Sequence, residues 1–477
     1  MNTIINFVIA ILILGSTCTL RAQWSPEISL NSGINEGYIW PRMSATSNGV
    51  YVIWGNSATD RIHGISVDKG IPGQQLILNQ NTDRAFITGW ASTEISAYQD
   101  KVAVVYKSEN AQTGSSFIIF SEDGGKTFSA PRVAIDGNDI LHRFPAIHID
   151  DSGLYVSFMR FETNFLEPQY DLRHFDSPAV DSFEDVGISE SVPGEVCDCC
   201  VSAITGNEDK VTVLFRNNDD NFRDIYAAVA SKSQLKFNTL ADLNAATWQI
   251  FSCPSTGADG MMSGDQLHAV FMSQHTGSQI VYLSSLNTID GTVEVDRKLL
   301  KNSSLAFQNF PRMAGNGDTI GVVMQGAEGR NQNVYFTYST TGTEGLGDTL
   351  MLLSTNSSGR QVNPDIAFQD GKFHMVWQDN STALVMYRTF DPSGLTTQTV
   401  TPTIEKLSVY PNPVMDKLSV LTESNFSTYN VIDLQGNVVR SYEVGNTLNI
   451  ADLESGLYIL KVTDNKGSQS AIRFIKQ

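Results

Sequence analysis

The sequence predicts an all-β protein, a seven-bladed β-propeller followed by a small C-terminal β-sandwich. One observation is a block that recurs seven times, at intervals of roughly 50 to 57 residues. Each copy holds two short apolar strands around a polar turn, and one such unit cannot bury both faces alone, so the copies must stack in a ring. A second observation is that residues 406–477 show a different pattern of short alternating strands. We therefore divide the chain into residues 1–22, 23–391, 392–405 and 406–477.

Residues 1–22 are expected to be a secretory signal peptide. An apolar run covers residues 7–14, and a plausible cleavage zone ends at Ala22. The run is too short for a membrane span, which needs about 20 apolar residues. No other stretch approaches that length, so we expect export and no transmembrane segment in the mature chain.

The repeated blocks supply the first two strands of each blade. They cover residues 40–54, 90–106, 144–159, 199–215, 253–272, 310–324 and 363–377. Further strands are expected after them, for example over residues 62–67, 76–79, 117–120, 132–135 and 225–230. The seventh block lacks a fourth strand, and residues 27–31 are similar to the fourth strands of other blades. We predict that this N-terminal segment completes the last blade and leaves no open edge.

Net charge and motifs exclude several functions. The formal net charge is −19, whereas binding to nucleic acid or to an anionic membrane needs a basic face. The sequence contains no P-loop, dinucleotide fingerprint or HExxH motif. We therefore expect no nucleic-acid partner.

Arginines and aromatic residues recur at the ends of the blocks. The first strand of a blade runs away from one face and the second runs back, so these ends share one face, the mouth of the ring. Arginine binds carboxylates through two parallel hydrogen bonds, and aromatic faces stack on sugars. This predicts a glycan or glycoprotein partner, although the aromatic residues could instead pack between blades and the arginines could form structural ion pairs. The candidates are Trp40, Arg42, Trp90, Arg143, Arg160, Arg216 and Arg312.

Glycoside hydrolysis would need two facing carboxyl groups. Glu94, Glu162 and Asp365 are the candidates at the mouth. Without such a pair, the alternative is a non-catalytic adhesion or carbohydrate-binding propeller.

Four cysteines remain after the signal peptide: Cys197, Cys199, Cys200 and Cys253. Export favours disulfides, and four cysteines allow three pairings. A bridge from the first three to Cys253 would close about 55 residues and contribute roughly 4 kcal/mol, with Cys197 joined to Cys199 or Cys200. The alternatives are a soft-metal site for copper or zinc, or another redox site. We expect no other cofactor.

Residues 121–128, with the sequence SEDGGKTF, resemble the Asp box (BNR repeat) of sialidase-like propellers. We expect a structural role, in which Asp123 accepts backbone N–H bonds, glycines adopt positive φ and Phe128 fixes the loop. The matching positions are Ser121, Asp123, Gly125, Thr127 and Phe128. The resemblance implies glycan handling, as an exo-sialidase-like hydrolase or as a binder. Sialidases have six blades, so a six-bladed ring is the alternative.

The CDCC stretch, followed by FRNN at residues 215–218, is similar to a group of secreted sialidase-like proteins. The resemblance implies that Arg216, Arg223 and Asp224 line a site beside the cysteines.

The C-terminal segment follows a linker rich in Thr, Ser, Pro and Gly. Its motifs YPNP (410–413), DLQG (433–436) and LESGLYIL (453–460) resemble the type IX secretion (Por) C-terminal sorting domain, type A. The resemblance implies a Gram-negative cell, passage through the type IX machinery and a secreted or outer-membrane-surface location.

Overall fold

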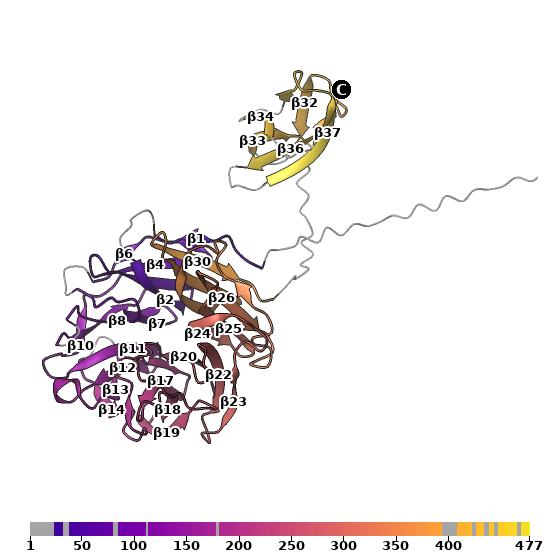
Figure 1. Ribbon diagram of the computed structural model, residues 1–477. Helices are drawn as coiled ribbons and strands as arrows, with labels where there is room; N and C mark the ends of the chain where they lie inside the picture. Colours follow the sequence, from indigo (N-terminus) through magenta and orange to yellow (C-terminus); the bar gives the residue numbers. More distant parts are fainter. Residues whose placement is uncertain are drawn as a thin grey trace, which may run out of the picture. The chain divides into compact units, whose positions relative to one another are not determined.

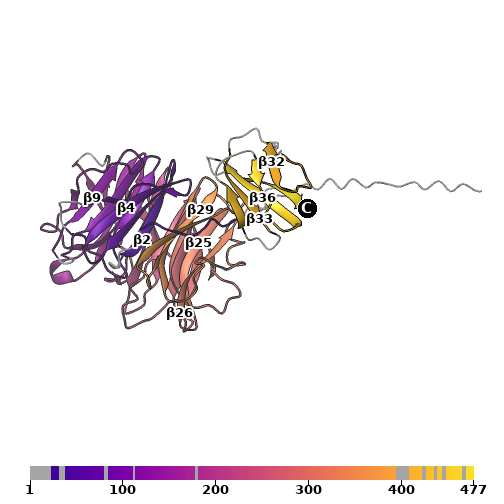
Figure 2. The same ribbon diagram turned by 90° about the horizontal axis from the view of Figure 1, so that it is seen from above.

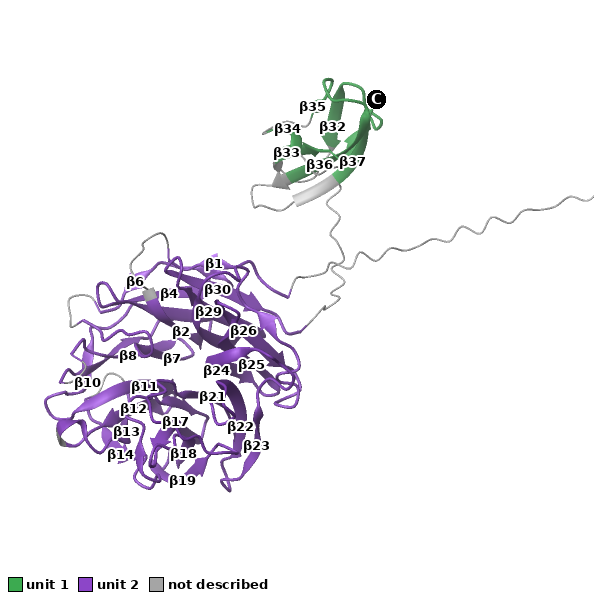
Figure 3. Ribbon diagram, in the orientation of Figure 1, with its two compact units in different colours: residues 1–19, 397–477 green, residues 20–396 purple. Residues whose placement is uncertain are grey.

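The computed structural model describes residues 23–31, 38–79, 84–110, 113–177, 181–393, 408–421, 426–433, 438–442, 447–464 and 469–477. The described residues fall into two compact units (Figure 3), one within Leu20–Thr396 and the other within Thr397–Gln477. The expected signal peptide lies outside the described residues, as do residues 394–405 of the linker and 434–436 of the DLQG motif. Within the described residues, no helix is long and apolar enough to cross a membrane.

The described residues of the larger unit form seven antiparallel sheets (Figure 1). The first three sheets contain β2(Tyr38–Thr46), β3(Gly49–Asn56), β4(Arg61–Asp68), β5(Ile71–Pro72) and β6(Leu76–Ile77); β7(Glu94–Tyr98), β8(Lys101–Lys107), β9(Ser116–Ser121) and β10(Arg132–Ile135); and β11(His142–Asp150), β12(Gly153–Arg160), β13(Gln169–Phe175) and β14(Glu184–Gly187). The next two contain β15(Glu195–Val196), β16(Ala203–Gly206), β17(Lys210–Asn218), β18(Ile225–Ser231) and β19(Lys236–Asp242); and β20(Ala258–Ser263), β21(Gln266–Ser273), β22(Ile280–Asn287) and β23(Val293–Lys298). The last two contain β24(Ala306–Asn316), β25(Thr319–Glu328), β26(Asn331–Ser339) and β27(Met351–Leu352); and β28(Gln361–Gln369), β29(Lys372–Asp379), β30(Leu384–Phe390) and β1(Ile28–Ser29).

The first strands of the sheets form a closed ring. Strands β2, β7, β11, β16, β20, β24 and β28 each contact the next, and β28 contacts β2. Figure 2 shows β9, β4 and β29 of three successive sheets side by side. Apolar side chains fill the space between sheets; Phe336 of β26 packs against Phe373 of β29, for example, with ring centroids 5.3 Å apart. The predicted all-β propeller fold is confirmed.

The N-terminal segment closes the ring as predicted. Strand β1 pairs with β30 through Ile28↔Tyr387 and Ser29↔Met386. Beyond the strand, the Asn31 side chain accepts a hydrogen bond from Val385 N (2.8 Å) and donates one to the Ala383 carbonyl (3.1 Å). The last sheet therefore contains both ends of the propeller.

The described part of the tail unit forms two sheets around its own apolar core. One sheet has the order β31(Ser408–Tyr410), β32(Lys417–Leu421), β35(Thr447–Asn449); the other has the order β34(Val438–Tyr442), β33(Phe426–Ile432), β36(Gly456–Asp464), β37(Gln469–Lys476). Buried residues from both sheets, such as Leu418 and Leu460, form the core. This arrangement is the predicted sandwich.

Candidate functional site

Four of the first strands open with the same backbone irregularity. Trp40, Phe144, Phe310 and Asn363 each precede a proline and adopt a left-handed φ of 47° to 58°, and the strand register shifts at each site. Such conformations are costly for residues other than glycine and persist only where surrounding contacts enforce them. All four side chains line pockets at the mouth.

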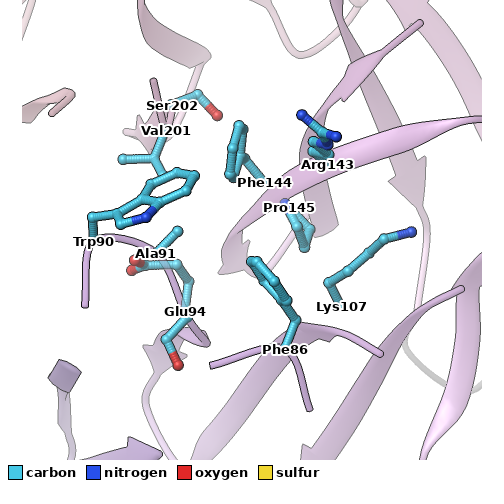
Figure 4. A pocket seen from close by; sticks show the side chains of 11 residues that line it. Phe86, Trp90, Ala91, Glu94, Lys107, Arg143, Phe144, Pro145, Val201 and Ser202 are labelled. Carbon is cyan, nitrogen blue, oxygen red and sulfur yellow. The ribbon is translucent and has the colours of Figure 1, made fainter. Parts of the chain in front are cut away.

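The larger of these pockets, here called the aromatic pocket, has a volume of about 200 Å³ (Figure 4). Trp90 and Phe144 meet in it edge to face, with ring centroids 5.3 Å apart. A smaller pocket on the other side of Val201 contains Trp40 and Phe310, 5.6 Å apart. The aromatic pocket is lined by Phe86, Trp90, Ala91, Ser92, Glu94, Lys107, Arg143, Phe144, Pro145, Val201 and Ser202.

Two polar atoms of the aromatic pocket are unsatisfied. Ser92 Oγ and Arg143 Nε are buried and have no hydrogen-bond partner among the residues that the structure describes. The Arg143 guanidinium lies over the rings of Phe165 (4.5 Å) and Phe161 (5.4 Å), and no carboxylate of the described residues forms a salt bridge with it. A ligand in this pocket could supply the missing partners.

Lys107 contributes its aliphatic stem to the pocket, and its ammonium group points away from Trp90 (Figure 4). Lys107 Nζ donates to the Gly114 carbonyl and lies 3.5 Å from His142 Nε2. Burial, with a smaller contribution from the Arg143 charge, lowers the pKa of Lys107 to about 7. Burial likewise lowers the pKa of His142 to about 3, so this imidazole is neutral at pH 7.

A ring of charged side chains lies deeper along the first strands. Each first strand contributes one residue to this ring. The seven positions are equivalent because each is paired across its sheet with a second-strand residue that directly precedes an aromatic residue or Met. In ring order they are Arg42, Glu94, Ala146, Ala203, Asp259, Arg312 and Asp365. Charges alternate around this ring except at the two alanines. A cavity of about 270 Å³ is lined by all of these positions except Arg42.

Arg312 connects the acidic members of the ring. Its guanidinium lies 3.1 Å from Glu94 Oε2, 3.0 Å from Asp365 Oδ1 and 3.7 Å from Asp259 Oδ1. Arg42 Nε contacts Glu94 Oε1 at 3.1 Å. Backbone N–H groups of Met43 and Met313 donate to Asp365 and Asp259, each at 2.8 Å.

These contacts involve two of the three predicted catalytic carboxylates, Glu94 and Asp365. Burial alone would raise the pKa of Glu94, but Arg42 and Arg312 outweigh it and hold the pKa below its ordinary value. Glu94 and Asp365 bind the same guanidinium and do not face each other as a free pair. The third candidate, Glu162, is exposed and binds Arg160 at 2.7 Å.

Four of the predicted arginines lie in three environments. Arg42 and Arg312 belong to the charged ring, and Arg143 lines the aromatic pocket. Arg160 binds Asp171 and Glu162, each at 2.7 Å. The sequence left structural ion pairs open as an alternative role for the arginines, and Arg160 forms such pairs.

Arg216, a predicted substrate-binding residue, is completely buried. Its guanidinium donates to the carbonyls of Arg223 (2.6 Å), Met272 (2.8 Å) and Thr256 (3.3 Å). Burial lowers its pKa to about 9. Asp224 is also buried and accepts a hydrogen bond from Trp248 N (2.9 Å), and burial raises the pKa of Asp224 to about 6.

The four cysteines gather in one cluster beside the mouth. The structure joins Cys197 to Cys200 and Cys199 to Cys253. Cys197 Sγ lies 3.5 Å from Cys199 Sγ and accepts a hydrogen bond from Arg223 Nη1 (3.1 Å). In this oxidised state none of the sulfurs is a thiolate, the form that binds copper or zinc.

The loop between β9 and β10 is stabilised by its own side chains. The Asp123 carboxylate accepts hydrogen bonds from Lys126 N (3.0 Å), Thr127 N (2.9 Å) and the Thr127 hydroxyl (2.7 Å). Gly125 has φ +86°, and a Cβ there would lie 2.1 Å from the Tyr51 ring. Phe128 packs on the same ring at 5.3 Å. The structural role expected for Asp123 follows from these bonds.

Sequence reasoning missed three parts of the site. Asp259 occupies the repeat position of Arg42 and Arg312, so an alignment of the blocks would have found it. Phe86 precedes the second block, and Ser92 lies within that block but before its first strand, where no repeat signal marks it.

Comparison with known proteins concerns the tail and the fold. Residues 408–477 match the secretion system C-terminal sorting domain. This confirms the predicted sorting domain and indicates a protein secreted by the type IX system, so extracellular or at the cell surface. No curated protein matches the chain.

Solved structures similar to the chain include other propellers. A Trypanosoma rangeli sialidase in complex with 2,3-difluorosialic acid is 10% identical (TM-score 0.40; 95% of this chain and 88% of that chain). The β-propeller domain of the Trilobed protease from Pyrococcus furiosus is 11% identical (TM-score 0.41; 75% and 98%). The polysaccharide lyase Uly1 is 9% identical (TM-score 0.44; 73% and 89%). At sequence identities of 9 to 11%, an activity for this chain has to be argued from its own residues.

Proposed function

We propose that this chain is a secreted propeller that binds glycans through the aromatic pocket and does not hydrolyse them. The observation that carries the proposal is the combination of aromatic walls, from Trp90 and Phe144, with two unsatisfied polar atoms, Ser92 Oγ and Arg143 Nε.

This combination suits a sugar. One face of a pyranose ring presents C–H groups that pack on an aromatic ring, and its hydroxyl groups can both donate to and accept from the pocket. Ser92 Oγ can do either, while Arg143 Nε can only donate. Pockets for drug-sized ligands span about 300 to 1,000 Å³, so about 200 Å³ favours one terminal sugar ring over an oligosaccharide.

The charged ring argues against hydrolysis. A glycosidase needs one carboxyl group that gives up a proton and a second that acts as nucleophile or base. Glu94 is held ionised by two guanidinium groups, which makes it a poor acid. Asp365 has both oxygens occupied, by Arg312 Nε and by Met43 N.

A glycan array with the full chain, followed by calorimetry on the best glycan, tests the proposal. Trp90→Ala should weaken binding at least about tenfold, since a buried aromatic anchor typically contributes about 2 kcal/mol or more. The matched control is Phe307→Ala, which removes an exposed aromatic residue (62%) outside the pocket and should leave affinity unchanged. Absence of any glycan ligand, or equal affinity of both variants, would contradict binding at this pocket. Release of free sugar by the wild-type chain would contradict the non-catalytic assignment.

A further inference from the structure

The cysteine cluster contains two disulfides that differ in access to solvent. Cys253 is an exposed residue and its partner Cys199 is half-buried, whereas Cys197 and Cys200 are buried. The two bridges are in contact, because Cys197 Sγ lies 3.5 Å from Cys199 Sγ. A thiol in solution can therefore reach the Cys199–Cys253 bridge, here called the outer bridge. The outer bridge in turn contacts the Cys197–Cys200 bridge, here called the inner bridge.

A buried guanidinium is directed at the inner bridge. Arg223 is more than nine-tenths buried and donates from Nη1 to Cys197 Sγ at 3.1 Å. Its Nε has no partner in the described part of the chain. No carboxylate of the described residues forms a salt bridge with Arg223. The Asp198 carboxylate acts on the Arg223 charge without forming a salt bridge with it. A cation beside sulfur stabilises the negative charge that develops on sulfur during thiol–disulfide exchange.

From this arrangement we propose that the cluster is a thiol–disulfide relay that reacts with small extracellular thiols. In the first step a thiolate attacks Cys253 Sγ, forms a mixed disulfide there and releases Cys199 as a thiolate. In the second step Cys199 attacks Cys197 Sγ, a Cys197–Cys199 bond forms, and the Cys197–Cys200 bond breaks. Cys200 leaves with the electron pair and takes a proton from water. One thiol is consumed and one is produced, so no separate oxidant or reductant is needed.

The relay reaches the aromatic pocket. Cys200 directly precedes Val201, which lines both mouth pockets, and Ser202, which lines the aromatic pocket. In the oxidised protein the Cys200 carbonyl accepts a hydrogen bond from Tyr170 Oη (2.6 Å) and its sulfur is tied to Cys197. Exchange breaks the Cys197–Cys200 bond, so a thiol that reacts at Cys253 alters the wall of the aromatic pocket.

Glutathione is the probe for the experiment. The folded full chain is treated with glutathione, free thiols are blocked with an alkylating reagent, and the modified cysteines are located by peptide mass spectrometry. The proposal expects a glutathione adduct on Cys253, a Cys197–Cys199 bond and alkylation of Cys200. An adduct on Cys253 with alkylation of Cys199 and an intact Cys197–Cys200 bridge would overturn the relay. No adduct, or an adduct on Cys199, would overturn it as well.

Two variants test the separate steps. Cys253→Ser frees Cys199 without an added thiol, and alkylation should then appear at Cys200; alkylation at Cys199 alone would overturn the second step. Arg223→Met should slow alkylation of Cys200 at least about tenfold, an effect within the range that thiolate stabilisation produces, and Arg223→Lys should restore part of the rate. The matched control Arg84→Met removes an exposed arginine (side chain 61%) outside the cluster. If it slows exchange as much as Arg223→Met, the assigned role of Arg223 is wrong.

Discussion

Replacement of Arg312 by methionine tests whether the charged ring holds the propeller together. Two guanidinium groups and three carboxylates face each other in the wild-type ring, for a net charge of −1. The variant keeps Arg42 with Glu94, Asp259 and Asp365, for a net charge of −2. Asp259 and Asp365 then have no salt-bridge partner among the described residues.

The expected loss of unfolding free energy is about 3 to 5 kcal/mol, the usual cost of removing one partner from a buried charge network. All six tryptophans lie between residues 24 and 377, so tryptophan fluorescence in a urea titration reports unfolding of the propeller alone. Lys301→Met is the control, because Lys301 and its partner Asp348 are both exposed. Exposed pairs contribute about 0 to 1 kcal/mol.

The pH dependence gives a second readout on the same variant. The pKa of Glu94 is lowered in the folded wild-type protein, so its contribution to stability is present above its ordinary value of 4.5 and is lost as the pH falls. Without Arg312 that contribution shrinks, so the wild-type and variant curves should differ most near pH 7 and converge at lower pH. A loss below about 1 kcal/mol at pH 7, or a loss that stays constant with pH, would refute the reasoning.

Two further predictions concern ring closure and a buried acid. Asn31→Ala leaves a buried N–H of Val385 and a carbonyl of Ala383 without their partner, so urea titration should show about 2 to 4 kcal/mol lower stability; a loss under about 1 kcal/mol would mean that β1 alone closes the ring. Because the pKa of Asp224 is raised to about 6, its contribution to stability is present below the ordinary value and is lost as the pH rises through about 6. Asp224→Asn should therefore gain up to about 3 kcal/mol over the wild type between pH 4 and pH 7, and an equal difference at both pH values would contradict the raised pKa.

The fold could be predicted because its determinants are local and repeated. Each block carries its own alternation of apolar residues and its own turn, and the missing fourth strand of the seventh block identified residues 27–31 as the closing segment. The sorting domain was evident for the same reason, since several short motifs occur in order over its length.

The site was harder to predict because its partners are far apart in the sequence. Glu94 and Arg312, which are 218 residues apart, were both placed at the mouth, but no local pattern shows that they bind each other. Arg143 and Arg216 both stand at block ends, yet one lines a pocket and the other donates to three backbone carbonyls. That difference depends on the neighbouring sheets and is not encoded next to either arginine.

The way in which the last strand of the propeller is fastened has a consequence for proteolysis. Asp391 N donates to the Gln23 carbonyl at 2.8 Å, and Thr389 N donates to Ser25 Oγ at 2.9 Å. The Arg388 guanidinium lies 4.4 Å from the centre of the Trp24 ring. A protease that cuts within residues 394–407 therefore leaves all three of these contacts intact. After such a cut, both ends of the propeller would remain hydrogen-bonded within one sheet.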